Sequence, residues 1–216
     1  MPLHYLKEDE NFNLGVWKIE EQESFFLETL QLTEFDKREL DAINAQNKRA
    51  QWLASRFLLK KLLGTKEILH LIKDQYGKPH VDGSKYYFSI SHCRNYAAVI
   101  ISKINCGVDI ETIETRIERI ASKFLYEHEI DPGDENYCTK LTIYWSTKES
   151  LYKLYGKKGL TFKTQLLVEP FEPADSDTLH CFIRVNGKTL PFDVSYQKMD
   201  DFIISYVTGS FEDHCT

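Results

Sequence analysis

The sequence predicts an α+β fold in which each half of the chain combines a few strands with one long helix. In the first half, apolar residues recur at helical spacing over residues 46–63. In the second half, a predicted helix over residues 139–155 precedes two strands, residues 181–185 and 190–196. Asn186-Gly187 joins these strands as a hairpin, because this pair suits a type I′ turn.

Local signals define the remaining elements of the first half. Residues 20–30 are expected to form a helix, because acidic residues at the start of a helix are favoured by its dipole. Thr33 with Asp36 predicts a capping box at the start of a second short helix. Gly64 suits the end of the long helix. A turn and three strands complete this half: a turn at Asp74–Lys78 and strands over 14–19, 86–90 and 97–101, the last two around a loop at 91–95.

In the second half, Asn105–Gly107 turns the chain into a short strand that ends at Glu111. A helix is expected over residues 117–129, and Asp131-Pro132-Gly133-Asp134 ends it. Glycines at 156 and 159 close the following long helix, and a last strand is predicted over residues 202–207.

Composition excludes several classes of protein. A net charge of −6 argues against general nucleic-acid binding, and no apolar run approaches the length of a membrane span. The N-terminus has no apolar signal region. Five cysteines are an odd number without a C-x-x-C pair, which favours a reducing cytosol over a disulfide scaffold. We therefore expect a cytoplasmic protein with no membrane and no nucleic-acid partner.

The segment Gly107-Val108-Asp109-Ile110-Glu111 suggests a metal site. Alternate residues of a strand share a face, so Asp109 and Glu111 project together while Val108 and Ile110 point to the buried side. Two adjacent carboxylates repel each other, and Mg²⁺ commonly binds one or two carboxylates together with water and substrate phosphate. The alternative is a solvated strand face.

A second segment, Trp145-Ser146-Thr147-Lys148-Glu149-Ser150-Leu151-Tyr152-Lys153, reads as a helix. Trp145, Glu149 and Lys153 lie in one row at four-residue spacing. This row could supply a third carboxylate and a cation for a phosphate, although an exposed ion pair between Glu149 and Lys153 is the alternative.

These two segments resemble the signature motifs of the 4′-phosphopantetheinyl transferases, and the chain length resembles the surfactin-synthetase (Sfp) type. Three further segments, in the same order, also resemble that family: Tyr76-Gly77-Lys78-Pro79, Phe88-Ser89-Ile90-Ser91-His92, and Phe124 with Glu129. The resemblance runs from about residue 45 to about residue 165.

The resemblance implies two similar small subdomains related by a pseudo-twofold axis. Each is a small antiparallel sheet packed on a long helix, with the active site between them. Residues 1–104 would form the N-terminal subdomain, which contacts the nucleotide of coenzyme A. Residues 105–216 would form the C-terminal subdomain, with the metal-binding strand, the catalytic helix and the last strands. A monomer is expected.

The resemblance also implies Mg²⁺-dependent transfer of 4′-phosphopantetheine from coenzyme A to a serine of an acyl or peptidyl carrier protein, releasing 3′,5′-ADP. Asp109, Glu111 and Glu149 would hold the metal. Glu149 and Lys153 would be catalytic, with Glu149 as base directly or through a water. A metal-bound water, or help from Glu129, is the alternative base.

Six residues are expected to contact coenzyme A: Arg49, Lys78, Ser91, His92, Lys148 and Lys153. The resemblance places Arg49 at the 3′-phosphate, Lys78 at the nucleotide, and His92, Lys148 and Lys153 at the phosphates. For Arg56 the structural interpretation is kept, and Arg94 either adds a phosphate contact or is merely exposed.

The carrier protein is expected to be acidic and helical, and to dock on residues 157–167, where Leu160 and Phe162 lie among lysines. Two other functions stay open. One is a degenerate family member that binds coenzyme A or a carrier without catalysis. The other is an unrelated Mg²⁺-dependent hydrolase of a nucleotide pyrophosphate.

Overall fold

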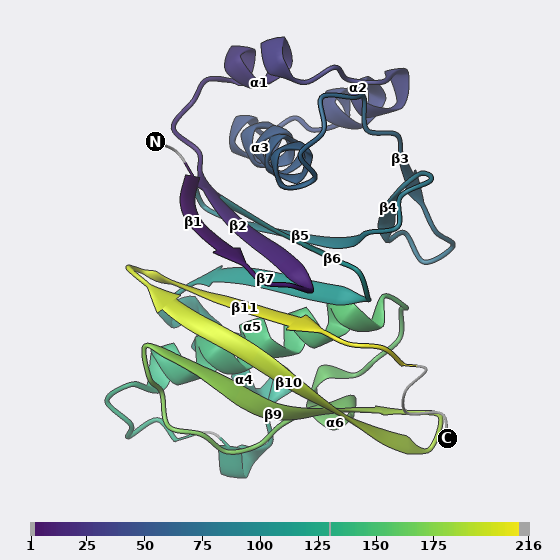
Figure 1. Ribbon diagram of the computed structural model, residues 1–216. Coiled ribbons are helices and arrows are strands. Elements are labelled where there is room, and N and C mark those ends of the chain that lie inside the picture. Colours follow the sequence, from purple (N-terminus) through teal and green to yellow (C-terminus); the bar gives the residue numbers. More distant parts are fainter. Residues whose placement is uncertain (1–2, 130, 212–216) are drawn as a thin grey trace. The chain divides into compact units, whose positions relative to one another are not determined.

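Each half of the chain forms an antiparallel sheet that packs on a long helix of the same half. This arrangement confirms the predicted α+β class (Figure 1). The computed structural model describes residues 3–129 and 131–211. The chain divides into two units, Met1–Ile104 and Asn105–Thr216.

The first unit contains a four-stranded sheet in the order β1-β2-β6-β5. Helix α3 (Gln46–Leu62) packs on β2 and β6, with Leu53, Ala54 and Leu58 fully buried. Two shorter helices and a separate two-stranded sheet accompany them. The bounds of these elements are β1 (Leu3–Glu8), β2 (Phe12–Lys18), α1 (Glu23–Thr29), α2 (Glu34–Asp41), β3 (Leu71–Lys73), β4 (Pro79–Val81), β5 (Tyr87–Cys93) and β6 (Tyr96–Ser102).

Predicted local signals in this unit are confirmed. Thr33 and Asp36 form a reciprocal capping box at the start of α2, and Gly64 follows α3 with a positive φ of 64°. The Asp74–Lys78 turn is closed by the Asp74 carboxylate, which accepts the backbone N–H groups of Tyr76 and Lys78.

One expectation for the first unit needs correction, and three of its strands, β1, β3 and β4, are additional to the predicted elements. Strand β1 was not predicted, and it pairs with β2 at the edge of the sheet. The loop expected over 91–95 is shorter, because β5 continues to Cys93 and pairs with β6 as far as Tyr96. Only Arg94 and Asn95 form the turn, and Arg94 has a positive φ of 41°. Ser91 and His92 therefore belong to the strand.

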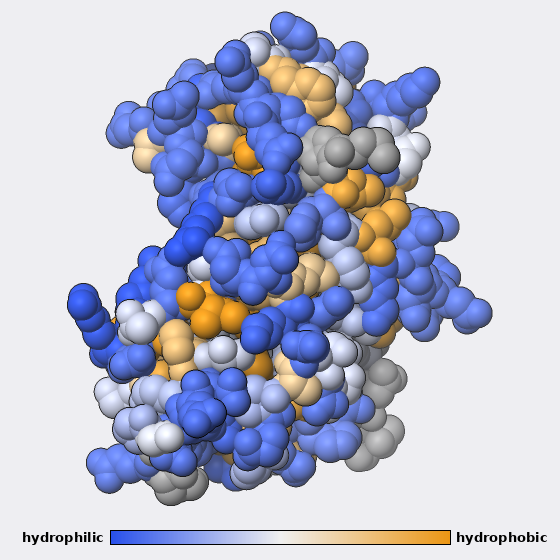
Figure 2. All heavy atoms as spheres, turned by 90° about the vertical axis from the view of Figure 1, so that its left-hand side faces the viewer, coloured by the Kyte–Doolittle hydropathy of each residue, from blue (hydrophilic) through white to orange (hydrophobic). Residues whose placement is uncertain are grey.

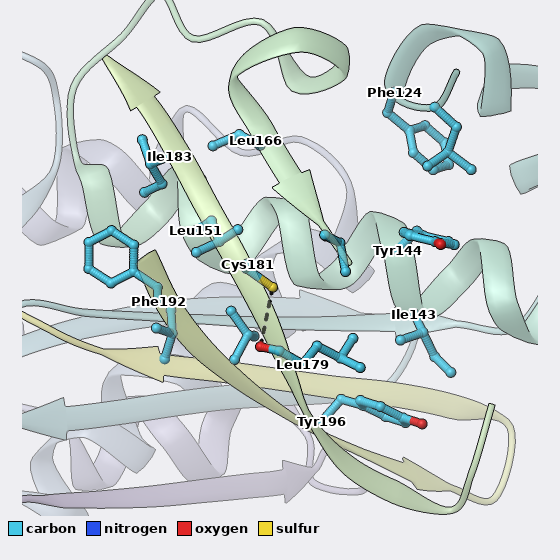
Figure 3. Packing of buried hydrophobic residues seen from close by; sticks show 14 of the residues in the cluster. Phe124, Ile143, Tyr144, Leu151, Leu166, Leu179, Cys181, Ile183, Phe192 and Tyr196 are labelled. Atoms are coloured by element: carbon cyan, nitrogen blue, oxygen red, sulfur yellow. Dashed lines mark hydrogen bonds between the residues drawn. The ribbon is translucent and has the colours of Figure 1, made fainter. Parts of the chain in front are cut away.

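The second unit contains a five-stranded sheet in the order β7-β11-β10-β9-β8, and helix α5 (Tyr137–Tyr155) packs on β7 and β11. Its strands are β7 (Cys106–Thr112), β8 (Leu166–Val168), β9 (Ser176–Val185), β10 (Lys188–Met199) and β11 (Phe202–Thr208). Asn186 and Gly187 both have positive φ and join β9 to β10, which confirms the predicted hairpin. Figure 3 shows side chains of α5, such as Ile143 and Leu151, among residues of β9 and β10, such as Ile183 and Tyr196.

The helix predicted over residues 117–129 is wrong. The chain instead forms a 3₁₀ helix (Thr115–Ile120), a short α4 (Ala121–Phe124) and a second 3₁₀ turn (Glu127–Glu129). Phe124 and Leu125 are both fully buried, although they are neighbours. The backbone becomes extended at Leu125, which ends the helix after Phe124. Another short helix, α6 (Phe162–Gln165), follows α5.

No helix within the described residues is long and apolar enough to cross a membrane. The face in Figure 2 is largely hydrophilic, with smaller apolar areas between the polar side chains. The exposed large apolar side chains come from separate segments of the chain and include Leu6, Phe35 and Ile72.

Candidate functional site

Gly107 allows helix α5 to lie very close to strand β7. A Cβ atom at this position would lie 2.0 Å from the carbonyl oxygen of Ser150 and 2.8 Å from the backbone nitrogen of Leu154. Any larger residue would therefore push the helix away from the strand. The sequence motif contained this glycine, but its role becomes visible only when the two segments are seen together.

A buried group of serine hydroxyls fixes α5 against the neighbouring strand β11. The Ser205 Oγ lies 2.8 Å from the Ser146 Oγ and 2.6 Å from the Ser150 Oγ. All three serines are fully buried. Because residues 146 and 150 are one turn apart, this network fixes the rotation of the helix and turns Glu149 and Lys153 toward a defined side of it.

Lys153 and Asp109 form an ion pair where α5 crosses β7. The Lys153 Nζ lies 2.8 Å from the Asp109 Oδ1 and donates to the carbonyl oxygen of Val108 at 3.0 Å. Asp109 is only 4% exposed, whereas a fully solvated strand face was the alternative interpretation. The structure therefore brings together residues from the two sequence motifs, 44 positions apart.

Glu111 lies two residues further along β7 and has two partners. Its Oε1 accepts the indole N–H of Trp145 at 3.4 Å, and its Oε2 lies 3.8 Å from the Arg116 guanidinium. Burial raises the pKa of Glu111, and the negative charge of Asp109 raises it further.

Glu149 shares this electrostatic environment. Its pKa is raised to about 7, first by burial and then by the charge of Asp109, with Glu111 adding in the same direction and Lys153 opposing it. Three carboxylates therefore influence one another, and a bound cation would relieve their repulsion.

The donor set suits Mg²⁺, because these carboxylates supply the hard oxygen ligands that this ion prefers. Within residues 3–129 and 131–211, however, no three or more His, Cys, Asp or Glu side chains lie together so that they alone could hold a metal ion. Since Mg²⁺ usually keeps several waters and substrate oxygens, the residues fit an ion that substrate would help to hold.

Lys148 is buried and binds two backbone carbonyl groups. Its side chain is 0% exposed, and its Nζ donates to the carbonyl oxygens of Phe124 at 2.6 Å and Phe162 at 3.2 Å. Burial lowers the pKa of Lys148 to about 8. This placement indicates a structural role, and the predicted phosphate contact stays a prediction.

Arg49 binds within the first unit. Its Nη2 lies 2.6 Å from the Glu23 Oε1, its Nε donates to the Glu23 Oε2 at 3.1 Å, and its Nη1 donates to the carbonyl oxygen of Leu40 at 2.6 Å. These bonds join α3 to α1 and to the end of α2. The predicted contact with a 3′-phosphate stays a prediction.

The other predicted coenzyme A contacts of this unit lie at the surface or near it. His92 is exposed on β5 beside the buried Ser91, and Lys78 ends the Asp74 turn. The sequence did not identify Gln51, whose side-chain amide donates to the Arg94 carbonyl oxygen at 2.6 Å and so ties the β5–β6 turn to α3. The signal in the sequence that could have indicated Gln51 is the occurrence of one amide side chain in a helix whose other inward-facing residues are apolar.

The contacts of Arg56 agree with the structural role expected for it. Its guanidinium lies over the Trp52 ring, 3.4 Å from the ring centre, and its Nη2 lies 3.3 Å from the Glu39 Oε2. Burial lowers the pKa of Arg56 to about 10.

Residues 105–207 match the family model described as the 4′-phosphopantetheinyl transferase superfamily. The match covers the strand with Asp109 and Glu111 and the helix with Glu149 and Lys153. It supports this superfamily and indicates an enzyme that transfers phosphopantetheine from coenzyme A to carrier proteins. No curated protein matches the chain.

Proposed function

We propose that the protein is an Sfp-type 4′-phosphopantetheinyl transferase that uses Mg²⁺ to modify a serine of an acyl or peptidyl carrier protein. The observation that carries this proposal is the ion pair between Lys153 and Asp109, with the charge of Asp109 also raising the pKa values of Glu111 and Glu149, inside the segment that matches the superfamily. Enzymes of phosphoryl transfer act chiefly by positioning groups and neutralising charge, and this constellation can do both.

Asp109, Glu111 and Glu149 would hold the metal ion. When bound, Mg²⁺ neutralises charge on the coenzyme A pyrophosphate and makes 3′,5′-ADP a better leaving group. Lys153, fixed by the Val108 carbonyl and the Asp109 carboxylate, would hold a positive charge beside the same phosphates.

The serine hydroxyl of the carrier would attack the phosphorus that bears the pantetheine arm. A new P–O bond forms to serine, the bond to 3′,5′-ADP breaks, and the serine proton passes to Glu149 directly or through a water. Glu129 is the alternative base, and its carboxylate accepts the backbone N–H of Tyr126.

Arg49, Lys78, Ser91 and His92 would bind the nucleotide and phosphate parts of coenzyme A. For Arg49 this requires that phosphate compete with Glu23 for the guanidinium, since both are anions that match its planar donors.

Docking of an acidic carrier would rely on the lysines after α5. Lys157 and Lys158 are exposed, whereas the Phe162 ring stacks on Trp145 at 5.3 Å and packs on Tyr152 at 5.4 Å. Charge attraction, more than apolar contact, would therefore attract the carrier to residues 157–167.

One assay separates the proposed function from its two rivals. The protein is incubated with coenzyme A, Mg²⁺ and a panel of apo carrier proteins, and the carriers are weighed intact by mass spectrometry. A transferase adds phosphopantetheine to a carrier and releases 3′,5′-ADP in equal amount. Release of free phosphopantetheine would instead identify a hydrolase, and binding of coenzyme A without turnover would identify a degenerate member.

A further inference from the structure

Trp145 connects the carboxylate of Glu111 to an aromatic cluster in the second unit. Its ring lies 5.1 Å from Phe124 and 5.3 Å from Phe162, measured between ring centres, and is nearly parallel to the latter. From this position the indole N–H donates to the Glu111 Oε1 at 3.4 Å. The ring's packing thus determines where its single donor points.

The two rings that flank Trp145 are themselves held through their backbones. Lys148, one turn along α5, donates its ammonium protons to the carbonyl oxygens of the same two residues, Phe124 and Phe162. A fully buried ammonium needs such partners, and the two carbonyls supply them. Lys148 therefore fixes Phe124 and Phe162, the two residues whose rings flank Trp145.

We propose that Trp145 is a positioning residue for Glu111: its N–H, aimed by the Phe124 and Phe162 rings and the Lys148 clamp behind them, orients the carboxylate for a divalent cation. This inference rests on the proposed function in taking Glu111 as a ligand of Mg²⁺. The bond to Trp145 uses one lone pair of Oε1, and a carboxylate offers about four such sites, so the group keeps capacity for a metal. Ligating carboxylates are commonly held in this way, and losing the holding group costs about 10–100-fold in metal affinity.

The test compares Trp145→Phe with Tyr152→Phe. The first variant keeps an aromatic ring between Phe124 and Phe162 but removes the N–H. The second changes a ring of the same cluster, 5.4 Å from Phe162, without touching a bond to Glu111. Calorimetry measures Mg²⁺ binding to each protein saturated with coenzyme A, and thermal unfolding measures its stability.

We expect Trp145→Phe to weaken Mg²⁺ binding by about tenfold or more, with turnover largely restored at high Mg²⁺. Tyr152→Phe should bind Mg²⁺ as the wild type does. Unchanged affinity in Trp145→Phe, or an equal loss in both variants, would overturn the positioning role. If the wild type binds Mg²⁺ and the variants differ as expected, but no carrier is modified, the proposed transfer fails while the role of Trp145 stands.

Discussion

Each unit contains an ion pair between a cation on its long helix and a carboxylate on another element, and the two pairs differ in their charge balance. Arg49 meets Glu23 through both carboxylate oxygens, and the pKa of Glu23 is lowered as a result. Lys153 meets Asp109, but the pKa values of the nearby Glu111 and Glu149 are raised.

The difference shows how a structural ion pair is distinguished from a reactive one. In the first unit one cation serves one carboxylate, and the pair joins two helices. In the second unit burial raises the pKa values of Glu111 and Glu149, the charge of Asp109 raises both further, and Lys153 offsets this only in part. Such a surplus of negative charge opposes folding unless a ligand neutralises it, and groups with perturbed pKa values concentrate at functional sites for this reason.

The strongest test of this contrast is Glu149→Gln. The amide keeps the shape and one oxygen but cannot accept a proton, so turnover should fall by about 10²–10⁴, the usual contribution of a general base. Coenzyme A and Mg²⁺ should still bind within several-fold of the wild type. Steady-state transfer rates, measured together with binding over a range of Mg²⁺ concentrations, check this.

The Mg²⁺ titration also separates the two roles of Glu149. If Glu149 is chiefly a ligand, affinity for the ion collapses in the variant and excess Mg²⁺ restores much of the rate. Unchanged turnover at ordinary Mg²⁺ would remove Glu149 from the mechanism.

In the first unit, Arg49→Ala should act on stability. Loss of the bonds to Glu23 and to the Leu40 carbonyl should lower the free energy of unfolding only modestly, because the pair is partly exposed and screened by solvent. Chemical denaturation measures the loss, and the exposed Arg38→Ala is the matched control.

The same Arg49→Ala variant tests the phosphate contact. A purely structural arginine affects the Michaelis constants for coenzyme A and dephospho-coenzyme A equally. A selective rise for coenzyme A would instead show that Arg49 binds the 3′-phosphate.

Lys148→Met should have the smallest effect on substrate binding. The variant leaves the carbonyl oxygens of Phe124 and Phe162 without their donor, which should lower the free energy of unfolding by about 1–3 kcal/mol. The Michaelis constant for coenzyme A should stay close to that of the wild type, and the exposed Lys158→Met is the control. Normal stability with a much higher Michaelis constant would restore the phosphate contact that the sequence predicted.

The fold was predictable wherever short-range chemistry decides it. The Thr33–Asp36 capping box and the Asn186-Gly187 turn depend on neighbouring residues alone, and the structure confirms both. The failure over residues 117–129 has the opposite cause. There the chain breaks into two 3₁₀ segments and a four-residue helix, so tertiary context overrides a helical pattern that the sequence favours.

For the site, the sequence identified residue types and the structure supplied their partners. The meeting of Lys153 with Asp109 follows from Gly107 and the serine network around Ser205, and both depend on segments far apart in the chain. Lys148 shows the limit most clearly. The family resemblance implied a phosphate contact for this residue, whereas the two carbonyl groups that bind it become visible only in the tertiary structure.

The central claim is that the surplus carboxylates on β7 and α5 form the metal site for phosphopantetheine transfer. It is tested most directly by measuring transfer to an apo carrier against Mg²⁺ concentration for the wild type and Asp109→Asn, with circular dichroism to confirm folding. The account predicts that the wild type requires Mg²⁺, and that the variant is folded, needs at least about tenfold more Mg²⁺ and transfers about 10²–10³ times more slowly. Equal rates and equal Mg²⁺ dependence in the two proteins would contradict it.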